Sequence, residues 1–229
     1  TALHRTVVVV ATSDQPALVR VQAALTATTI AEYFRDAGNH VLLLVDSLSR
    51  IATAQREVGL AAGEPPATHG YPPSVFTLLP QILERAGNRQ QGSMSAFYSV
   101  LSDHDGSDDP VSEAARSFLD GHIVLSQQLA NAGHFPAIDV LRANSRLMPQ
   151  LVDPPHYDAA VHIRRALATL REHEDLLAMG AYQENQNPRL DRVMRRRTEL
   201  LQWLTQGTTE PNHPEEARQS MLELANTLQ

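Results

Sequence analysis

A short apolar run that ends in a carboxylate constrains this chain more than any other feature. Residues Val41 to Val45 are all Val or Leu, and Asp46 follows them directly. An uninterrupted run of this kind predicts a strand buried on both faces, as in a parallel sheet covered by helices. In open α/β sheets, ligands bind in the crevice beyond the carboxyl ends of the strands. Asp46 therefore has two readings: it holds a hydrated Mg²⁺ against phosphate oxygens, or it caps the next helix.

Further apolar runs alternate with helical patterns over the first 150 residues. This alternation predicts an α/β fold with a mainly parallel sheet flanked by helices. We expect the ends of Val7–Ala11, Val41–Val45 and Ile123–Leu125 to lie on one edge of a crevice. The predicted strands are Val7–Ala11, Val41–Val45, Met94–Leu101 and His122–Ser126, and the predicted helices are Pro16–Ala37, Arg50–Leu60, Ser74–Arg85 and Val111–Leu119.

The remainder of the chain is different in character. A Pro-rich stretch, Leu151–His156, precedes a region in which only helical patterns occur. Three apolar stripes predict three amphipathic helices that pack into a small all-α domain. We therefore predict two domains, residues 1–150 and 151–229. The stripes consist of Ala160, Ile163, Leu167, Leu170 and Leu177, then Leu190, Val193, Leu200 and Leu204, then Ala217, Met221, Leu224 and Leu228.

The chain contains no lysine, and all 19 of its basic residues are arginine. A phosphate-binding P-loop requires the Lys of G-x-x-x-x-G-K-[ST], because its ammonium group reaches the β- and γ-phosphates. No such loop is present, so this chain by itself is not a complete P-loop enzyme. It also has no cysteine, which excludes disulfides and thiolate metal sites.

Charge and hydropathy narrow the function classes further. The formal net charge is −7, which argues against a nucleic-acid-binding surface over the whole chain. No apolar run approaches the roughly 20 residues that a membrane span needs. The sequence therefore predicts an ordinary soluble globular chain of one or two domains.

Two polar segments have a functional and a structural interpretation. The loop Asp103–Asp109 superficially suggests calcium binding, but its glycine is the fourth residue and Ala114 stands where a bidentate Glu is needed. A solvated acidic loop is the better interpretation. The run Arg195–Arg197 is either a patch for a partner or a lipid, or simply the hydrated face of a helix, and we favour the second alternative.

Several longer strings give the sequence a specific resemblance. Together they resemble the flagellar and type III secretion ATPases, which are relatives of the α and β subunits of ATP synthase. The last string resembles the virulence (injectisome) branch more than the flagellar branch. The strings are Val7–Ser13, Thr28–Asp36, Asp46–Arg50, Ala54–Arg56, Gly63–Gly70, Tyr71–Phe76, Leu83–Gly87, Asp120–Ser126, Pro136–Leu141 and Trp203–Gly207.

The resemblance implies an N-terminally truncated RecA-like P-loop NTPase core followed by a small all-α C-terminal domain. Members of the family carry a β-barrel, the P-loop and a catalytic Glu upstream of the position of Thr1. Residues 1–150 then form a partial ATPase domain that lacks the P-loop, and residues 151–229 form the helical domain. We expect this truncated chain alone to be inactive.

The resemblance also assigns the site residues and cofactors, which are ATP and Mg²⁺. Asp46 matches the Walker B acid that holds the metal, and it is therefore both a catalytic residue and a metal ligand. Arg146 matches the arginine finger that enters the site of a neighbouring subunit, although the sequence alone would favour a surface ion pair. Phe135 matches an aromatic residue that packs on adenine, where the family usually has Tyr. His69 departs from the usual Lys or Arg.

The implied parent protein is a homohexameric ATPase that releases chaperones and unfolds export substrates. Its implied partners are those chaperones and substrates, together with the central stalk and stator proteins of the export apparatus. Its implied location is cytoplasmic, peripheral at the inner membrane, with no nucleic acid bound. The alternatives are a non-catalytic module that binds chaperones or the stalk, a flagellar rather than a virulence ATPase, and, more weakly, a hexameric transcription-termination helicase.

Overall fold

The computed structural model describes residues 2–102 and 109–228, and the contacts divide them into two compact units, 1–119 and 120–229. Each unit is described by itself. The first contains the only parallel strand pair among the residues described. Its elements in chain order are η1 Ala2–Arg5, α1 Ala17–Asp36, β1 His40–Val45, α2 Leu48–Ala61, η2 Thr68–Gly70, α3 Pro73–Leu83, β2 Gly87–Asn88, β3 Ser93–Tyr98 and α4 Pro110–Phe118.

The sheet of the first unit has the strand order β1-β3-β2. Strands β1 and β3 run parallel with His40 opposite Ser93 and Val45 opposite Tyr98, and β2 pairs with β3 antiparallel. The mainly parallel sheet and the α/β class are therefore confirmed. The predictions of strands at Val41–Val45 and Met94–Leu101 correspond to β1 and β3, and the helix predictions before residue 120 correspond to α1, α2, α3 and α4.

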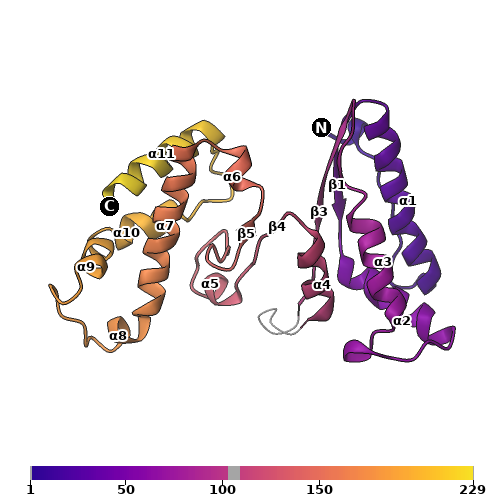
Figure 1. Cartoon of the computed structure of the whole chain (residues 1–229), viewed down its shortest axis with the longest axis horizontal. Helices are drawn as coiled ribbons and strands as arrows, with labels where there is room; N and C mark the ends of the chain where they lie inside the picture. Colours follow the sequence, from indigo (N-terminus) through magenta and orange to yellow (C-terminus); the bar gives the residue numbers. More distant parts are fainter. Residues whose placement is uncertain (1, 103–108, 229) are drawn as a thin grey trace. The chain divides into compact units, whose positions relative to one another are not determined.

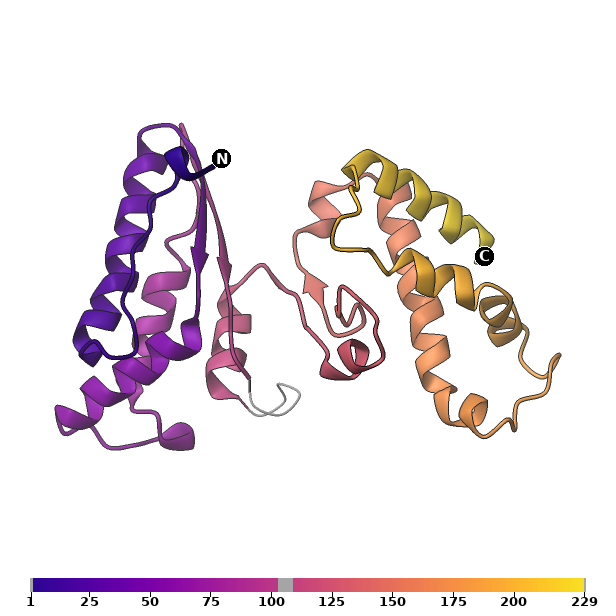
Figure 2. The ribbon, with the colours of Figure 1, turned by 180° about the vertical axis from the view of Figure 1, so that it is seen from behind.

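Helices α1, α2 and α3 gather on one side of β1 and β3 (Figures 1 and 2). Leu43 and Met94 are buried on this side and pack with Ala31 of α1. The main core lies among the helices, where Leu48, Leu79 and Ile82 are fully buried. Burial of these side chains fixes the helices against the sheet, and this in turn fixes the carboxyl end of β1.

The opposite face of the sheet is not covered by the described residues of the first unit. Leu42 and Leu44 alternate with the buried Leu43 along β1, and their exposed fractions are 60% and 68%. Phe97, which is in register with Leu44, is 59% exposed. Within the first unit, the expectation that β1 is buried on both faces is therefore wrong, because the helices of this unit pack on one face only.

We expect this face, Leu42, Leu44 and Phe97, to drive self-association of the isolated chain. Replacing both Leu42 and Leu44 with Gln removes apolar surface, so the dissociation constant measured by sedimentation should rise by about 10-fold or more. The matched control is Leu60→Gln, an exposed leucine of α2 outside this face. Equal association of both variants would contradict the prediction.

Two of the predicted strands are not formed. Val7–Ala11 has no regular secondary structure, and the four valines Val7–Val10 are exposed, because no strand among the residues described pairs with them. Of His122–Ser126, only His122 belongs to a strand, β4 Gly121–His122, and Leu125 makes a single bridge to Ile138. Apolar composition alone does not make a strand without a pairing partner. The predicted crevice edge therefore reduces to the end of β1.

The second unit is a helical bundle preceded by a pair of short antiparallel strands. Its core joins α7, α9, α10 and α11, and it includes Ile163, Val193, Leu200 and Leu224 from the three predicted stripes. Trp203 packs against this core, and its Nε1 donates to Ser220 Oγ of α11 at 2.9 Å. The elements are β4 Gly121–His122, α5 Gln127–Asn131, β5 Asn144–Ser145, α6 Met148–Leu151, α7 Pro154–Glu172, α8 Glu174–Ala178, α9 Pro188–Arg195, α10 Arg197–Trp203 and α11 Pro214–Thr227.

The start of α7 explains the Pro-rich stretch. Asp153 caps the helix by accepting from the His156 N–H at 3.1 Å, and Pro154 occupies the first turn, where no N–H is needed. The contacts divide the chain between Leu119 and Asp120, whereas the sequence changes character near residue 150. The boundary at residues 150 and 151 stays a prediction. The acidic loop at Asp103–Asp109 lies outside the described residues except for Asp109, which caps α4.

Candidate functional site

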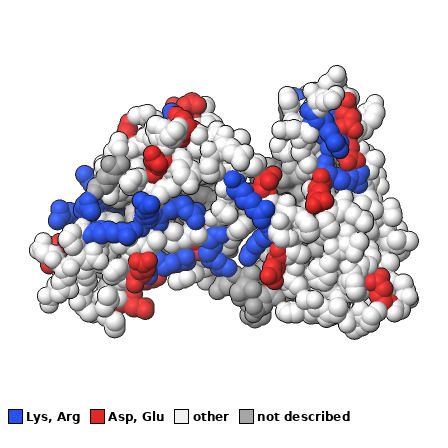
Figure 3. All heavy atoms as spheres, viewed as in Figure 1, with Lys and Arg blue, Asp and Glu red and all other residues white. Residues whose placement is uncertain are grey.

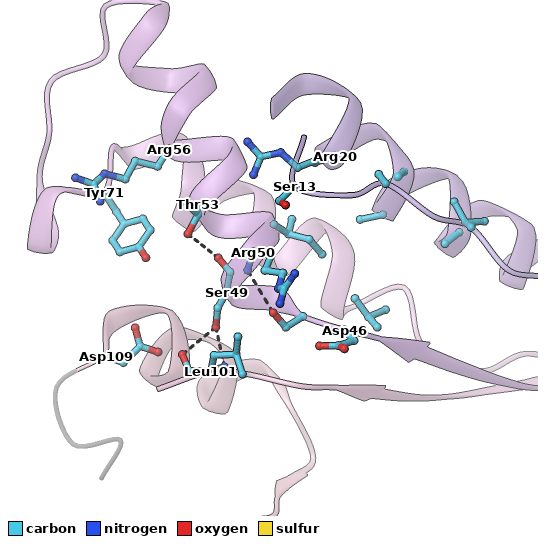
Figure 4. Close-up of a pocket in the computed structure, with 18 of the residues that line it drawn as sticks. Ser13, Arg20, Asp46, Ser49, Arg50, Thr53, Arg56, Tyr71, Leu101 and Asp109 are labelled. Atoms are coloured by element: carbon cyan, nitrogen blue, oxygen red, sulfur yellow. Dashed lines mark hydrogen bonds between the residues drawn. The ribbon is translucent and has the colours of Figure 1, made fainter. Parts of the chain in front are cut away.

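Asp46 lies at the carboxyl end of β1, immediately after Val45 (Figure 4). Its side chain is exposed, and its Oδ1 accepts from the Ser99 hydroxyl at 2.9 Å. Helix α2 is capped by Ser47, whose side chain accepts from the Arg50 N–H at 3.4 Å. The helix cap is therefore supplied by the next residue, and one Asp46 oxygen remains for another ligand.

Hydrogen bonds connect the exit of β1 with the exit of β3. The Leu48 N–H donates to Ser99 O at 2.9 Å, and the Ser99 N–H donates to Val45 O at 3.0 Å. The Ser49 hydroxyl donates to Leu101 O at 3.1 Å and accepts from the Leu101 N–H at 2.9 Å. The strand ends and the start of α2 consequently form one fixed frame around Asp46.

A cavity of about 860 Å³ opens at this frame. Arginines from two helices surround it, Arg20 from α1 and Arg50 and Arg56 from α2 (Figure 4). The guanidinium of Arg20 pairs with Glu57 at 2.7 Å, and the Arg56 guanidinium carbon lies 5.5 Å from the centroid of the Tyr71 ring. Hydroxyls from Ser13, Ser47, Ser49 and Thr53 also line the cavity. Cations and hydroxyl donors suit an anionic, phosphate-bearing ligand.

The donor set at Asp46 fits Mg²⁺ bound together with a phosphate. Mg²⁺ prefers hard oxygen ligands and is usually held by one or two carboxylates plus substrate phosphates and water. Among the residues described, no three His, Asp or Glu side chains gather as a protein-only metal site. His69 also lines the cavity, with a left-handed φ of 51°. The arrangement is thus suited to a shared metal, with Asp46 as the protein ligand.

Arg146 follows β5 in the second unit. Strand β5 pairs antiparallel with β4, and the Arg146 N–H donates to Asp120 O at 2.7 Å. The approach is close, because a Cβ added at Gly121 would lie 2.6 Å from Asn144 O. Glycine is therefore required in β4, and the pairing of β4 with β5 holds the backbone that carries the exposed Arg146 side chain.

Phe135 lies in the loop after α5 and is 53% exposed. Its carbonyl accepts from the Gln206 N–H at 2.8 Å, which links this loop to the segment after α10. An exposed ring on a tethered loop is available for stacking. Phe135 and Arg146 belong to the unit 120–229 and Asp46 belongs to the unit 1–119, so each is described within its own unit.

Asp139 was missed by sequence reasoning. Its buried carboxylate accepts from the Leu141 and Arg142 N–H groups, each at 3.1 Å, and from Arg171 Nη2 at 2.9 Å. Burial by itself would raise the pKa of this carboxyl, but the Arg171 guanidinium and the backbone donors outweigh it and hold the pKa below its usual range. The only sequence signal was an Asp within the apolar string Pro136–Leu141.

The run Arg195–Arg197 joins α9 to α10, and all three side chains are exposed. Arg196 pairs with Glu199 at 3.2 Å. A separate hollow of about 450 Å³ in this unit is lined by His162, Arg165, Arg189 and Arg192. Figure 3 shows arginine side chains gathered in a band across the visible face of the helical unit.

A mainly parallel sheet with helices on one face, and a carboxylate beside a cavity lined by cations and hydroxyls at a strand end, are typical of a nucleotide-binding α/β protein. Comparison with known sequences gives the same class. Residues 1–145 match the ATP synthase alpha/beta family, nucleotide-binding domain, and residues 152–223 match the T3SS EscN ATPase C-terminal domain. The chain belongs to the family of flagellar and type III secretion ATPases, and its first part has the RecA-like P-loop NTPase fold.

Relatives from both branches of the family are similar to this chain. The flagellum-specific ATP synthase of Bacillus subtilis is 51% identical over 94% of this chain and 49% of its own length. The type 3 secretion system ATPase of Sinorhizobium fredii is 50% identical over 93% of this chain and 48% of its own length. These nearly equal values do not separate the branches. The chain spans about half the length of the curated relatives that it matches.

Solved structures agree with the sequence comparison. The assembled ATPase EscN in complex with its central stalk EscO, from the type III secretion system of enteropathogenic E. coli, matches with a TM-score of 0.85 and 44% identity. The match covers 94% of this chain and 51% of that chain. In the part of the chain that the structure describes, no helix is both long and apolar enough to cross a membrane.

Proposed function

We propose that this chain is the C-terminal half of a protein-export ATPase of the type III secretion family, which hydrolyses ATP as a homohexameric ring. The observation that carries the proposal is the position of Asp46, exposed at the carboxyl end of a parallel strand and open to a cavity with cationic and hydroxyl groups. The similarity of the helical C-terminal part to the EscN ATPase C-terminal domain supports the export role.

Asp46 acts as the metal ligand and Arg146 as the finger of a neighbouring subunit. The Asp46 carboxylate would hold Mg²⁺, which would supply positive charge to the phosphate oxygens during transfer. The Ser99 hydroxyl orients this carboxylate by donating to its Oδ1. The planar guanidinium of Arg146 presents several donors to the equatorial oxygens of the phosphoryl group. Phe135 stacks on adenine, for which only the face of the ring is needed.

The proposed partners follow from the same family. They are secretion chaperones and export substrates, which the ring releases and unfolds, together with the central stalk and stator proteins. A stalk partner is supported by the EscN–EscO complex. The proposed location is cytoplasmic, at the inner face of the membrane that carries the export apparatus.

Asp46→Asn in the full-length protein tests the metal role. The amide cannot supply a charged oxygen to Mg²⁺, so we expect ATP turnover to fall by about 10²-fold or more, with nucleotide binding no longer strengthened by Mg²⁺. The measurements are steady-state phosphate release and nucleotide titration with and without Mg²⁺.

The control for this test is Glu84→Gln, which neutralises an exposed carboxylate at the end of α3, outside the cavity. The control should keep its turnover and its response to Mg²⁺. Turnover of Asp46→Asn within about threefold of the unchanged protein, with assembly intact, would overturn the proposed role of Asp46.

A second candidate function is a non-catalytic docking module. The observation in its favour is the hollow lined by His162, Arg165, Arg189 and Arg192, a cationic surface on a chain with net negative charge (Figure 3). Such a surface suits acidic segments of protein partners. ATP turnover of the full-length protein distinguishes the two candidate functions. A docking module would hydrolyse no ATP even at full length, whatever residue occupies position 46.

A further inference from the structure

Arg164 of α7 holds the turn that leads to Arg146. Its guanidinium donates from Nη1 to Val140 O at 2.6 Å and to Ala143 O at 3.0 Å, and from Nη2 to Leu141 O at 3.2 Å. Three carbonyls of one turn thus converge on a single half-buried side chain. A planar fork with several fixed donors suits this geometry, whereas an ammonium group is a single point.

The other side of the same turn is held by Asp139. Its carboxylate accepts from two backbone N–H groups of the turn and from Arg171 of α7. Arg164 and Arg171 are seven residues apart, two helical turns, so they lie on the same face of α7. The turn 139–143 is therefore attached to α7 at two points, through its carbonyls and through its buried carboxylate.

The turn continues without interruption into β5, and Arg146 is the next residue after this strand. The last residue of the turn, Ala143, precedes β5 directly. The His122 ring lies 2.9 Å from Arg142 O, and the Arg146 N–H donates to Asp120 O at 2.7 Å. The segment from Asp139 to Arg146 is hydrogen-bonded along its length. A displacement of the turn at residues 139–143 therefore also displaces Arg146.

We propose that Arg164 is a positioning residue for Arg146. Through the contacts of Arg164, helix α7 of the second unit fixes the backbone position from which the Arg146 side chain extends. This inference rests on the proposed function, because it requires Arg146 to act at the site of a neighbouring subunit. A catalytic group has to be held within about 0.5 Å of its productive position. Loss of the three carbonyl contacts frees the turn and lowers the fraction of time that Arg146 is in place.

The test compares Arg164→Met with Arg195→Met in the full-length ring. Both substitutions remove a guanidinium from a helix of the unit 120–229 and keep a long unbranched side chain, but the Arg195 side chain is exposed at the end of α9 and lines neither cavity. We expect Arg164→Met to lower kcat by about 10- to 100-fold, with KM for ATP within about threefold. Arg195→Met should leave both constants nearly unchanged.

A double-mutant cycle with Arg146→Ala measures the coupling between the two residues. A purely structural role of Arg164 would give no such coupling. If Arg164 acts through Arg146, then adding Arg164→Met to Arg146→Ala should cost no further turnover. Full additivity of the two losses would overturn the positioning role, as would an unchanged kcat for Arg164→Met. If Arg164→Met fails to assemble, Arg164→Lys, which keeps the charge and loses the fork, is put through the same cycle.

The same cycle distinguishes the inference from the proposed function. Normal turnover of an Arg146→Ala ring would show that Arg146 is not an arginine finger, and the proposed function would then fail. A strong effect of Arg146→Ala combined with none of Arg164→Met would leave the ATPase proposal standing and overturn the role of Arg164. Mass measurement of the hexamer accompanies each variant.

Discussion

Replacing Arg146 with Ala in a full-length ring is expected to lower ATP turnover by roughly 10³-fold or more, while ATP affinity stays within a few-fold. The reason is that a finger stabilises charge that develops only in the transition state, so its loss has little effect on the bound ground state. Turnover is measured by steady-state phosphate release and affinity by nucleotide titration. Arg195→Ala, which removes another exposed arginine of the same unit, is the control and should keep normal turnover.

Two further experiments test whether a guanidinium is needed at position 146 and whether it acts from a neighbouring subunit. Arg146→Lys should restore little activity, because one ammonium group does not reproduce the fork of the guanidinium. Mixed rings of Arg146→Ala and Asp46→Ala subunits should recover part of the turnover, because some interfaces then combine an intact Asp46 with an intact Arg146. No recovery of turnover in confirmed mixed hexamers would count against action of Arg146 across the subunit interface. The alternative, a surface ion pair, would then be the better interpretation of Arg146.

The isolated chain is expected to release phosphate from ATP no faster than buffer and to form no native hexamer. It contains no lysine to reach the β- and γ-phosphates, and no residue of this chain matches the catalytic Glu of the family. Phosphate release and molar mass by light scattering are the measurements. The same chain with Asp46→Ala, purified identically, is the control for contaminating ATPases.

The control decides how a positive result is read. Equal rates for the two preparations assign any residual hydrolysis to contaminants. A rate above buffer that Asp46→Ala abolishes would contradict the prediction, because it would show catalysis by this chain without a P-loop lysine. A discrete hexamer of the isolated chain would contradict the assembly part in the same way.

Local patterns predicted the parts of the structure that depend on local interactions. The strand β1 and the helices on either side of it were predictable, because apolar spacing and Gly or Pro breaks are properties of neighbouring residues. Asp46 was predictable as a site residue for the same reason, since it follows the strand directly. The capping residue was not predicted, because only Asp46 was considered as the cap, whereas the following residue, Ser47, caps α2.

Features that depend on distant partners were not predictable from one sequence. Val7–Ala11 has strand composition, but the pairing that would make it a strand is non-local. Arg164 contacts residues that are 21 to 24 positions away in the sequence, and its partners there are backbone carbonyls. Every residue has such a carbonyl, so the side chains of the turn do not reveal these contacts. The resemblance located Arg146 and Phe135, and only the structure indicated what holds them.

The hydrogen bond between Trp203 and Ser220 gives the protein an internal spectroscopic reporter. Trp203 is the only tryptophan of the chain; it is the last residue of α10, packs against the core of the second unit and is hydrogen-bonded to α11. Fluorescence excited at the red edge of the absorption band therefore follows the melting of that unit alone, while circular dichroism follows both units. A difference between the two melting curves would measure how far the units unfold independently, with no label attached to the protein.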